Sequence, residues 1–297
     1  MDGSVTLDQE KKILIVGLGL IGGSYAAALS AKGMEVGAID PDPDAIAFAE
    51  KNGFIRHGRT EPDADYVGLF NIIVFALYPH ILLDWLDKYG PWLREGAVAT
   101  DVTGVKSGVV EKAQALLSPR VEFIGAHPMA GREVSGVENA RADLFQGANY
   151  IVTPTPANTE ETIECCEALG RLLGVRSISR LTPKEHDEMI GFLSQLTHCI
   201  AVALMTCKES RHLVDYTGDS FRDLTRIAKI NENMWTELFL WNREELLSQM
   251  DLFIAHFGKL RDALAQGDEE TMKSMMRLST ERRRYFDKKP DEQKTIQ

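Results

Sequence analysis

The stretch IGAHPMAGREVSG places a histidine, His127, at the end of an apolar run and directly before a proline. Such a histidine can simply pack in the core, or it can handle a proton, because neutral imidazole accepts a proton near pH 7. Ligands bind at the carboxyl ends of the strands in open α/β sheets. If the apolar run is a parallel strand, His127 lies where acid–base chemistry can occur, and both interpretations stay open at this point.

A glycine-rich stretch near the N-terminus, ILIVGLGLIGG, carries Gly17, Gly19 and Gly22 in the spacing Gly-x-Gly-x-x-Gly. The first glycine permits a tight turn, the second lets the backbone approach a pyrophosphate, and the third lets a helix pack closely on a strand. The N-terminus of that helix offers amide donors and the positive end of its dipole to phosphates. We therefore expect a dinucleotide site formed by Gly17, Gly19, Leu20, Ile21, Gly22 and Asp40.

Asp40 ends the next apolar run, where sites of this kind carry an acid that binds a ribose. A carboxylate there accepts hydrogen bonds from the ribose 2′ and 3′ hydroxyls and repels a 2′-phosphate. The residues that follow, PDPD, provide no arginine that would neutralise such a phosphate. The sequence therefore favours NAD over NADP as the cofactor.

The elements that must position these residues follow a regular pattern. Over residues 1–180, short apolar runs alternate with helical patterns, as where KILIVGLG leads into IGGSYAAALSAKG, and NIIVFALYP is apolar enough for a strand buried on both faces. This alternation predicts a doubly wound, mostly parallel sheet, which is a Rossmann-type dinucleotide-binding domain. After Leu181 the strand patterns stop, and residues 181–297 predict an all-α domain.

The helical part opens at TPKEHDEMIGFL, with a threonine cap, a proline in the first turn and early acids. From NMWTELFLW onward, apolar residues recur at helical spacing, which predicts one long helix of about eight turns. The apolar positions are Trp235, Phe239, Leu246, Met250, Phe253, Phe257, Leu260 and Leu264. A helix this apolar needs a covering surface, because burial of apolar area contributes about 25 cal/mol per Å². We therefore predict a homodimer through the helical domain.

Composition argues against several classes of protein. The net charge of −11 disfavours a nucleic-acid partner, which needs a clustered basic face. The four cysteines form no Cys-x-x-Cys pair, so we expect reduced thiols and no metal site. The polar residues MDGSVTLDQEKK are unlike a secretory signal, which favours a cytoplasmic protein. The most apolar stretch, MIGFLSQLTHCIAVALMTC, carries Ser194, Gln195 and His198, which favour a buried helix over a membrane span.

Together, the glycine pattern, GAHPMAGREVSG, SQLTH and FRDLTRIAKINENMW resemble the prephenate dehydrogenase family, in the family's order and over residues 10–285. These are tyrosine-pathway enzymes and include arogenate-using relatives. The resemblance implies an oxidative decarboxylation, in which hydride leaves a ring alcohol for the nicotinamide of NAD and loss of carbon dioxide makes the ring aromatic. It also implies that the helical domain binds the substrate, prephenate or arogenate.

The resemblance implies roles for individual residues. His127 is the expected acceptor of the hydroxyl proton. Arg226 is expected to hold a substrate carboxylate, which a guanidinium fork binds bidentately, and Glu133 to pair with Arg226 and shape the mouth of the site. Trp235 is expected to reach the pocket of a partner subunit. The remaining expected contacts with substrate come from Ser194, Gln195, His198 and Asp187.

The sequence departs from the family at DVTGVK, where many members carry a serine and this chain has Gly104. The neighbouring Thr103 could supply the missing hydroxyl, so Thr103 is a further candidate for substrate binding. Asp219, in GDSF, adds a carboxylate that could favour arogenate, whose side chain carries an ammonium group. Two other functions stay open: a reductase of the β-hydroxyacid dehydrogenase type with the same two-domain architecture, and a catalytically silent NAD-binding regulator.

Overall fold

Eight strands form a sheet in the order β3-β2-β1-β4-β5-β6-β7-β8. The strands are β1 (Lys12–Val16), β2 (Glu35–Ile39), β3 (His57–Arg59), β4 (Ile72–Phe75), β5 (Val98–Asp101), β6 (Glu122–Pro128), β7 (Asn149–Thr153) and β8 (Ser177–Arg180). Neighbouring strands pair in parallel, apart from the antiparallel β6–β7 pair. The prediction of a doubly wound, mostly parallel sheet is confirmed.

This computed structural model describes residues 7, 10–117, 119–209 and 211–287. The residues on which the prediction about a secretory signal rested lie mostly outside this range. The chain forms two compact units, Met1–Leu246 and Leu247–Gln297. The sheet and every predicted site residue belong to the first unit.

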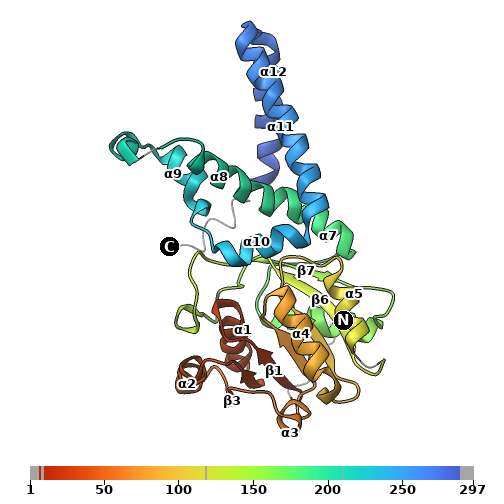
Figure 1. The fold of residues 1–297 in the computed structure, drawn as a ribbon. Coiled ribbons are helices and arrows are strands. Elements are labelled where there is room, and N and C mark those ends of the chain that lie inside the picture. The colour runs from red at the N-terminus through yellow and green to blue at the C-terminus, as the bar shows by residue number, and fades with distance from the viewer. Residues whose placement is uncertain (1–6, 8–9, 118, 210, 288–297) are drawn as a thin grey trace. The chain divides into compact units, whose positions relative to one another are not determined.

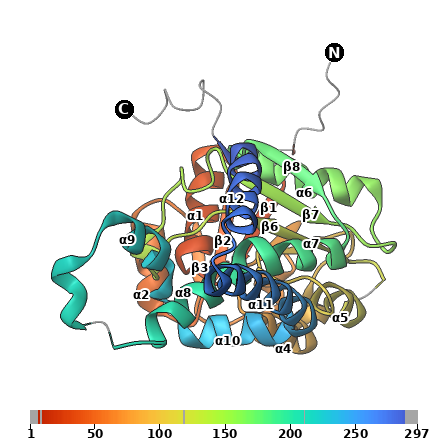
Figure 2. The ribbon, with the colours of Figure 1, turned by 90° about the horizontal axis from the view of Figure 1, so that it is seen from above.

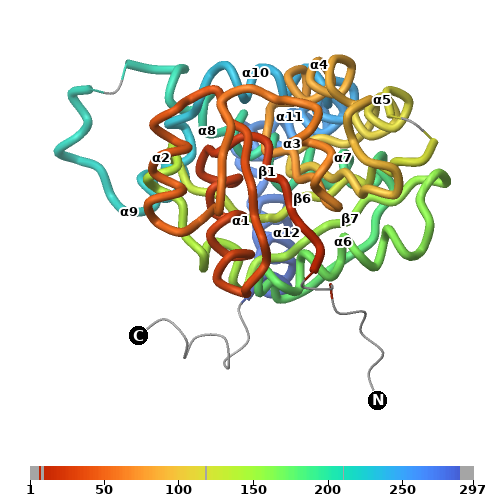
Figure 3. Tube along the Cα trace, turned by 90° about the horizontal axis from the view of Figure 1, so that it is seen from below, coloured from red at the N-terminus to blue at the C-terminus, as the bar shows by residue number. Residues whose placement is uncertain are grey.

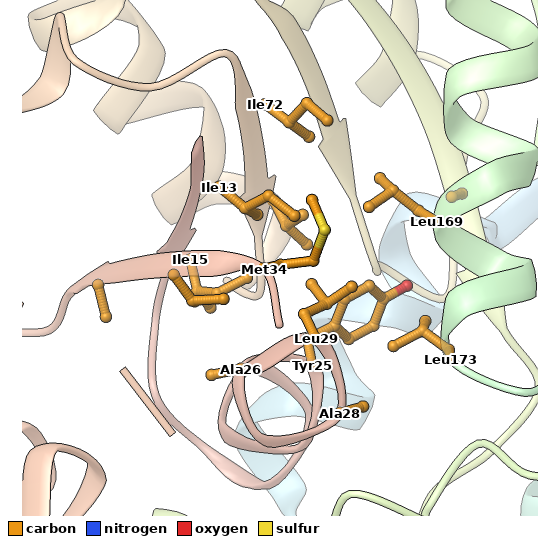
Figure 4. Packing of buried hydrophobic residues seen from close by; sticks show 14 of the residues in the cluster. Ile13, Ile15, Tyr25, Ala26, Ala28, Leu29, Met34, Ile72, Leu169 and Leu173 are labelled. Atoms are coloured by element: carbon orange, nitrogen blue, oxygen red, sulfur yellow. The ribbon is translucent and has the colours of Figure 1, made fainter. Parts of the chain in front are cut away.

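Helices cover both faces of the sheet because the strand side chains alternate between the faces. Ile13 and Ile15 of β1 pack with the helices α1 (Leu20–Ala31), α2 (Pro43–Lys51) and α6 (Glu160–Leu172). Leu14 and Val16 pack with α3 (Ala64–Val67), α4 (Pro79–Tyr89) and α5 (Val109–Leu116) on the opposite face. Figure 3 shows these two layers on either side of the strands. Figure 4 shows that Leu169 of α6 packs in the same hydrophobic cluster as Ile13 and Ile15.

The strand order puts the candidate residues at one edge of the sheet. β1 has β2 on one side and β4 on the other, so the chain leaves this point in opposite directions and opens a crevice at the carboxyl ends of the strands. The glycine loop follows β1 there. Since β5 and β6 are part of the same parallel array, Asp101 and His127 end at this same edge.

After β8 the first unit is helical. The helix α7 (Pro183–Ile190) continues through the π-helical turn η3 (Gly191–Gln195) into α8 (Leu196–Thr206). Thr182 caps α7 as predicted, because its hydroxyl accepts from the amide of Glu185 while the Glu185 carboxylate accepts from the amide of Thr182. The stretch Pro183–Thr206 is long and apolar enough to cross a membrane by length and composition alone, a test that core helices of soluble proteins also pass.

The chain from α8 to α10 includes η4 (Arg211–Tyr216), α9 (Asp219–Thr225) and η5 (Arg226–Ala228), and α9 extends away from the sheet in both Figure 1 and Figure 2. The single long helix predicted from NMWTELFLW onward is wrong: α10 (Glu232–Trp241) and α11 (Arg243–Gln266) are separate helices. Asn242 lies between them with φ −104° and ψ 26°, outside helical values. Its side chain is buried and makes hydrogen bonds elsewhere in the unit, which explains the interruption.

The second unit contains the rest of α11, then α12 (Glu269–Arg283) and η6 (Arg284–Phe286). The apolar stripe predicted for this region is largely uncovered within one chain. Phe257 is 62% exposed and Leu264 is 69% exposed, and the rings of Phe253 and Phe257 stack on each other in the open. Two short 3₁₀ helices, η1 (Gly90–Trp92) and η2 (Val137–Asn139), complete the described elements of the chain.

Candidate active site

The three glycines of the loop after β1 each meet a different constraint. Gly17 has φ +95°, and a β-carbon there would lie 2.6 Å from the carbonyl oxygen of Ala76. A β-carbon at Gly22 would lie 1.9 Å from the carbonyl oxygen of Gly17, so only glycine lets α1 approach the loop. At Gly19, by contrast, a β-carbon would meet nothing within 4 Å, so the backbone faces open space. This geometry fits a loop that turns tightly and leaves room for a pyrophosphate.

The first turn of α1 is free to bind an anion. Gly19 is the N-cap and provides no side-chain hydrogen bond, and the first turn holds no acidic side chain. The amides of Leu20 and Ile21 lie in this first turn, at the positive end of the helix dipole, where main-chain amides lack acceptors within the helix. Asp40 braces the same loop, because its carboxylate accepts from the amides of Leu18 (2.6 Å) and Asp42 (2.9 Å). These residues fit a dinucleotide.

His127 belongs to a chain of hydrogen bonds that starts on α7. Its Nδ1 lies 2.9 Å from Nε2 of His186, and Nδ1 of His186 lies 2.7 Å from Oδ1 of Asp187. His186 and Asp187 are buried, whereas His127 is partly exposed. The Asp187 carboxylate can only accept, so Nδ1 of a neutral His186 carries the hydrogen and Nε2 accepts from Nδ1 of His127. This network leaves Nε2 of His127 with a free lone pair.

The free nitrogen of His127 faces the loop that follows β5. A β-carbon built on Gly104 would lie 3.9 Å from Nε2 of His127 and 3.8 Å from a methyl group of Leu238 on α10. Because Gly104 carries no side chain, only the backbone of its loop borders the space beside Nε2 of His127 at this position.

Two buried carboxylates hold this loop. Asp187 accepts from the amides of Lys106 (2.8 Å) and Ser107 (2.7 Å). Asp101 accepts from the Lys106 ammonium at 2.6 Å and, through its other oxygen, from the amide of Ala126, the residue before His127. The loop and the end of β6 are thus fixed to each other on both sides of the imidazole.

The same contacts correct two predictions. Thr103 was expected to offer its hydroxyl to substrate, but this hydroxyl is 2.8 Å from the carbonyl oxygen of Val105 and also contacts the carboxylate of Asp101. Thr103 is 6% exposed, so its hydroxyl serves the loop. Asp187 was expected to contact substrate, but it is 1% exposed and its oxygens bind the loop amides and His186.

Gln195 also has a different position from the one predicted. It was expected to flank the substrate face of the helix, but it is 1% exposed. Its Nε2 donates to the carbonyl oxygen of Leu238 (3.3 Å), and its Oε1 accepts from Asn242 (2.7 Å). Gln195 therefore joins η3 to α10 inside the unit.

His198 and Trp235 form a second cluster. Their ring centroids lie 3.7 Å apart with an interplanar angle of 30°. Nδ1 of His198 donates to the carbonyl oxygen of Ser194 at 2.9 Å, so Nε2 is its free nitrogen, and Ser194 and His198 are one turn apart as predicted. Within its own chain the indole of Trp235 packs on His198, and its contact with a partner's pocket stays a prediction.

Arg226 and Glu133 form an ion pair through Nη1 and Oε1. Both side chains are substantially exposed, and their charges act on the pKa of His198, which places them beside the second cluster. α10 connects the two clusters, because Leu238 lies near Gly104 and Trp235 lies one turn before it on the same helix.

Desolvation favours the neutral form of these histidines. Desolvation, followed by the charges of His186 and Lys106, holds the pKa of His127 well below its usual value of 6.5. Desolvation also lowers the pKa of His186, although the hydrogen bond to Asp187 opposes this effect. Burial lowers the pKa of Lys106 too, against the attraction of Asp101. A neutral imidazole is the form that can accept a proton.

Sequence reasoning missed His186, Asp101, Lys106 and Asn242. His186 stands next to the predicted Asp187 in EHDEM. One signal in the sequence could have identified it: it is a polar residue at the first position of a capped helix that faces the interior. Nothing in the sequence indicated its partner, because the contact joins residues 59 positions apart.

These pKa shifts predict how stability depends on pH. Because the folded pKa of His127 lies below 6.5, the unfolded chain takes up a proton that the folded chain refuses as the pH falls through 6.5. The free energy of unfolding therefore decreases in acid, by at most about 1.4 kcal/mol per pH unit for each such histidine. Urea unfolding between about pH 7.5 and 5.5 measures how steeply the free energy of unfolding changes with pH. This slope should be smaller for His127→Asn than for the parent protein, whereas His57→Asn, the variant of an exposed histidine, should keep the parent slope. Equal slopes in all three proteins would contradict the burial argument.

Two family models match the chain in succession. One is described as prephenate dehydrogenase, nucleotide-binding domain, and matches residues 25–179. The other is described as prephenate dehydrogenase, dimerization domain, and matches residues 182–278. The prephenate dehydrogenase of Lactococcus lactis is 34% identical over 276 residues, which cover 88% of this chain and 73% of that protein.

Solved structures agree with the sequence matches. Prephenate dehydrogenase from A. aeolicus, crystallised with hydroxyphenyl propionate and NAD+, superposes with a TM-score of 0.86 and 28% identity over 96% of this chain and 100% of that chain. Synechocystis arogenate dehydrogenase gives a TM-score of 0.81 and 26% identity over 93% of this chain and 100% of that chain. The chain therefore belongs to the prephenate dehydrogenase family, oxidoreductases of tyrosine biosynthesis that join a Rossmann-type nucleotide-binding domain to a helical dimerisation domain.

Proposed function

We propose that this protein oxidises and decarboxylates prephenate to 4-hydroxyphenylpyruvate, with NAD as the cofactor. The observation that carries this proposal is the free Nε2 of a neutral His127, held by His186 at the same sheet edge as the glycine loop. Membership of the prephenate dehydrogenase family argues against the alternative function of a β-hydroxyacid dehydrogenase. The intact network around His127 argues against a silent regulator.

When bound, NAD would provide the acceptor for the hydride from the ring carbon. Gly17, Gly19 and Gly22 would form the cradle for its pyrophosphate, and the amides of Leu20 and Ile21 would donate to it. Asp40 supports NAD over NADP, because a carboxylate that already faces the loop would repel a 2′-phosphate.

His127 is the proposed base. As the substrate alcohol becomes a carbonyl, Nε2 of His127 takes the hydroxyl proton, and the imidazolium formed keeps its Nδ1 hydrogen bond to His186. Asp187 in turn stabilises His186, as the carboxylate does in a Ser-His-Asp triad, here with one more imidazole in the chain. Positioned general-base catalysis contributes roughly 10²–10⁴-fold to the rate.

The second cluster would bind the rest of the substrate. Arg226 is exposed and its ion pair with Glu133 is open to solvent, so the guanidinium can exchange the Glu133 carboxylate for a substrate carboxylate. His198 offers its free Nε2, and the stacked face of Trp235 provides an apolar wall. Ser194 fixes the orientation of His198 through its carbonyl group.

Arogenate is the alternative substrate, and its case rested on Asp219. The side chain of Asp219 is 92% exposed and pairs with Arg222 at the start of α9, so it gives no support to an ammonium site. The free carboxylate of Glu133 after such an exchange could still accept an ammonium group. Comparing the rate of cofactor reduction with each substrate decides between them.

We also propose a homodimer through the helical domain, working in the cytoplasm. Its support is the match to a dimerisation domain over residues 182–278 and the uncovered apolar side chains of α11. The buried polar residues His186, Asp187 and Gln195 within the apolar stretch Pro183–Thr206 argue against a membrane span there.

Replacing the base tests the mechanism. His127→Asn should lower kcat by roughly 10²–10⁴-fold and leave KM for prephenate nearly unchanged, because the variant loses proton transfer and keeps the binding residues. Steady-state kinetics measures both constants, and fluorescence titration checks that the cofactor still binds. A variant with parent kcat would remove His127 from the mechanism.

Arg226 has a matched control on the same segment. Arg226→Ala should weaken substrate binding by about 1.5–3 kcal/mol, the value of a lost charged hydrogen bond, and change kcat less. Arg222 lies one turn earlier with the same exposure of 63%, and Arg222→Ala should leave KM unchanged. If both variants raise KM equally, the effect is general charge and Arg226 has no specific role.

Cofactor choice depends on Asp40. The parent protein should have the higher kcat/KM with NAD, and Asp40→Ser should reduce that preference by removing the charge that repels a 2′-phosphate. Kinetics with both cofactors at saturating prephenate measures the ratio. A parent protein that uses NADP with the higher kcat/KM would contradict the assignment.

A further inference from the structure

Asn242, the residue between α10 and α11, has a buried side chain whose amide nitrogen donates both of its hydrogens. It is 4% exposed. Its Nδ2 donates to the main-chain carbonyl oxygen of Asp187 at 2.9 Å and to Oε1 of Gln195 at 2.7 Å. An amide nitrogen has two hydrogens, so both are committed. One residue thus joins the start of α11 to α7 and to η3.

The contact with Asp187 leads to the proposed base. The Asp187 carboxylate binds His186, and His186 binds Nδ1 of His127. Asp187 also holds the amides of Lys106 and Ser107, the loop that carries Gly104 beside Nε2 of His127. The position of the Asp187 backbone therefore determines the position of the His127 imidazole, through His186, and of the loop that carries Gly104.

The contact with Gln195 connects Asn242 to Leu238 of α10, which lies on the other side of the space beside Nε2 of His127. Gln195 donates to the carbonyl oxygen of Leu238, and the side chain of Leu238 lies near the Gly104 position. Asn242 also donates its own amide to the same carbonyl oxygen at 3.2 Å. Loss of the Asn242 side chain would leave this main-chain bond in place but would remove the links from Asn242 to Asp187 on α7 and to Gln195, which binds α10.

We propose that Asn242 is a positioning residue for the reaction, which sets the place and orientation of His127 through Asp187 and His186. The proposal depends on the proposed role of His127 as base. Without the Asn242 side chain, the carbonyl oxygen of Asp187 keeps the amide of Gly191 as a donor, but the buried Oε1 of Gln195 loses the donor from Asn242, and the structure must move to replace it. A movement of η3, which continues α7, would displace His186, and a misplacement of about 1 Å can reduce a rate 10²-fold.

The variant Asn242→Asp tests this role most sharply, because it keeps the shape and replaces a double donor with an acceptor that faces two oxygens. We expect kcat to fall at least about tenfold, with KM for prephenate and NAD within about twofold of the parent. The added carboxylate joins those of Asp187 and Asp101 near the histidines, where Lys106 is the opposing charge on His127 and His186, and it favours the imidazolium. The acid limb of the kcat profile should therefore move to higher pH.

Asn158 provides a matched control in the nucleotide-binding part of the first unit. Its Nδ2 donates to the carbonyl oxygen of Phe123 at 2.9 Å, and its Oδ1 accepts from the amide of Thr155 at 2.9 Å. Asn158→Asp also loses an amide donor to a main-chain carbonyl, but the hydrogen bonds of Asn158 within the described residues reach Phe123 and Thr155, and none of them reaches His186 or Asp187. It should lower the Tm without changing kcat or its pH profile.

The outcomes separate the possibilities. Parent kcat and an unshifted profile in folded Asn242→Asp, or a loss confined to KM, would overturn the positioning role. Equal kcat losses in Asn242→Asp and Asn158→Asp would also overturn it, since the effect would be general destabilisation. If Asn242→Asp does not fold, Asn242→Ser, which keeps one donor, is judged by the same criteria. Parent kcat in His127→Asn would instead refute the proposed function.

Discussion

The hydrogen bond between Nδ1 of His127 and Nε2 of His186 is the interaction on which the rest of the site depends. It fixes the tautomer of His127, turns the free lone pair toward the loop after β5, and ties a strand of the nucleotide-binding sheet to the first helix that follows the sheet. Without it the imidazole could rotate or carry its hydrogen on the wrong nitrogen, and neither form would accept a proton from a substrate hydroxyl. The bond is possible because burial keeps both rings neutral, so that one can donate while the other accepts.

The buried ion pair of Asp101 and Lys106 contributes to the position of His127. Asp101 and Lys106 form an ion pair that is fully enclosed, and such pairs are a poor means of raising stability because their desolvation opposes their attraction. Here the pair is placed where geometry matters: Asp101 holds the amide before His127, and the backbone of Lys106 is held by Asp187. Lys106 also helps to keep the pKa of His127 low, so the base stays ready at neutral pH. The arrangement supports a view in which buried polar groups give precision to the site.

The sequence allowed the fold to be predicted because the signals were local. Alternating apolar runs and the spacing of Gly17, Gly19 and Gly22 depend only on neighbouring residues, and each glycine meets the constraint expected of it. Side-chain partners are different. Thr103, Asp187 and Gln195 are of the right type for substrate contacts, but the fold directs all three into the interior. His186 and Asn242 could not be found, since their roles depend on contacts across 59 and 55 residues, and asparagine at Asn242 carries no helix-breaking signal of the strength of glycine or proline.

The central claim is that His127 is a neutral imidazole with its hydrogen on Nδ1 and a free Nε2. Nitrogen NMR of the protein labelled at histidine measures this directly, because the two ring nitrogens shift differently in each tautomer and in the charged form. We expect the Nδ1–H tautomer at neutral pH, with titration only below the usual value of 6.5, and loss of that tautomer preference in His186→Ala. An Nε2–H tautomer, or titration at or above 6.5 in the parent protein, would contradict the account.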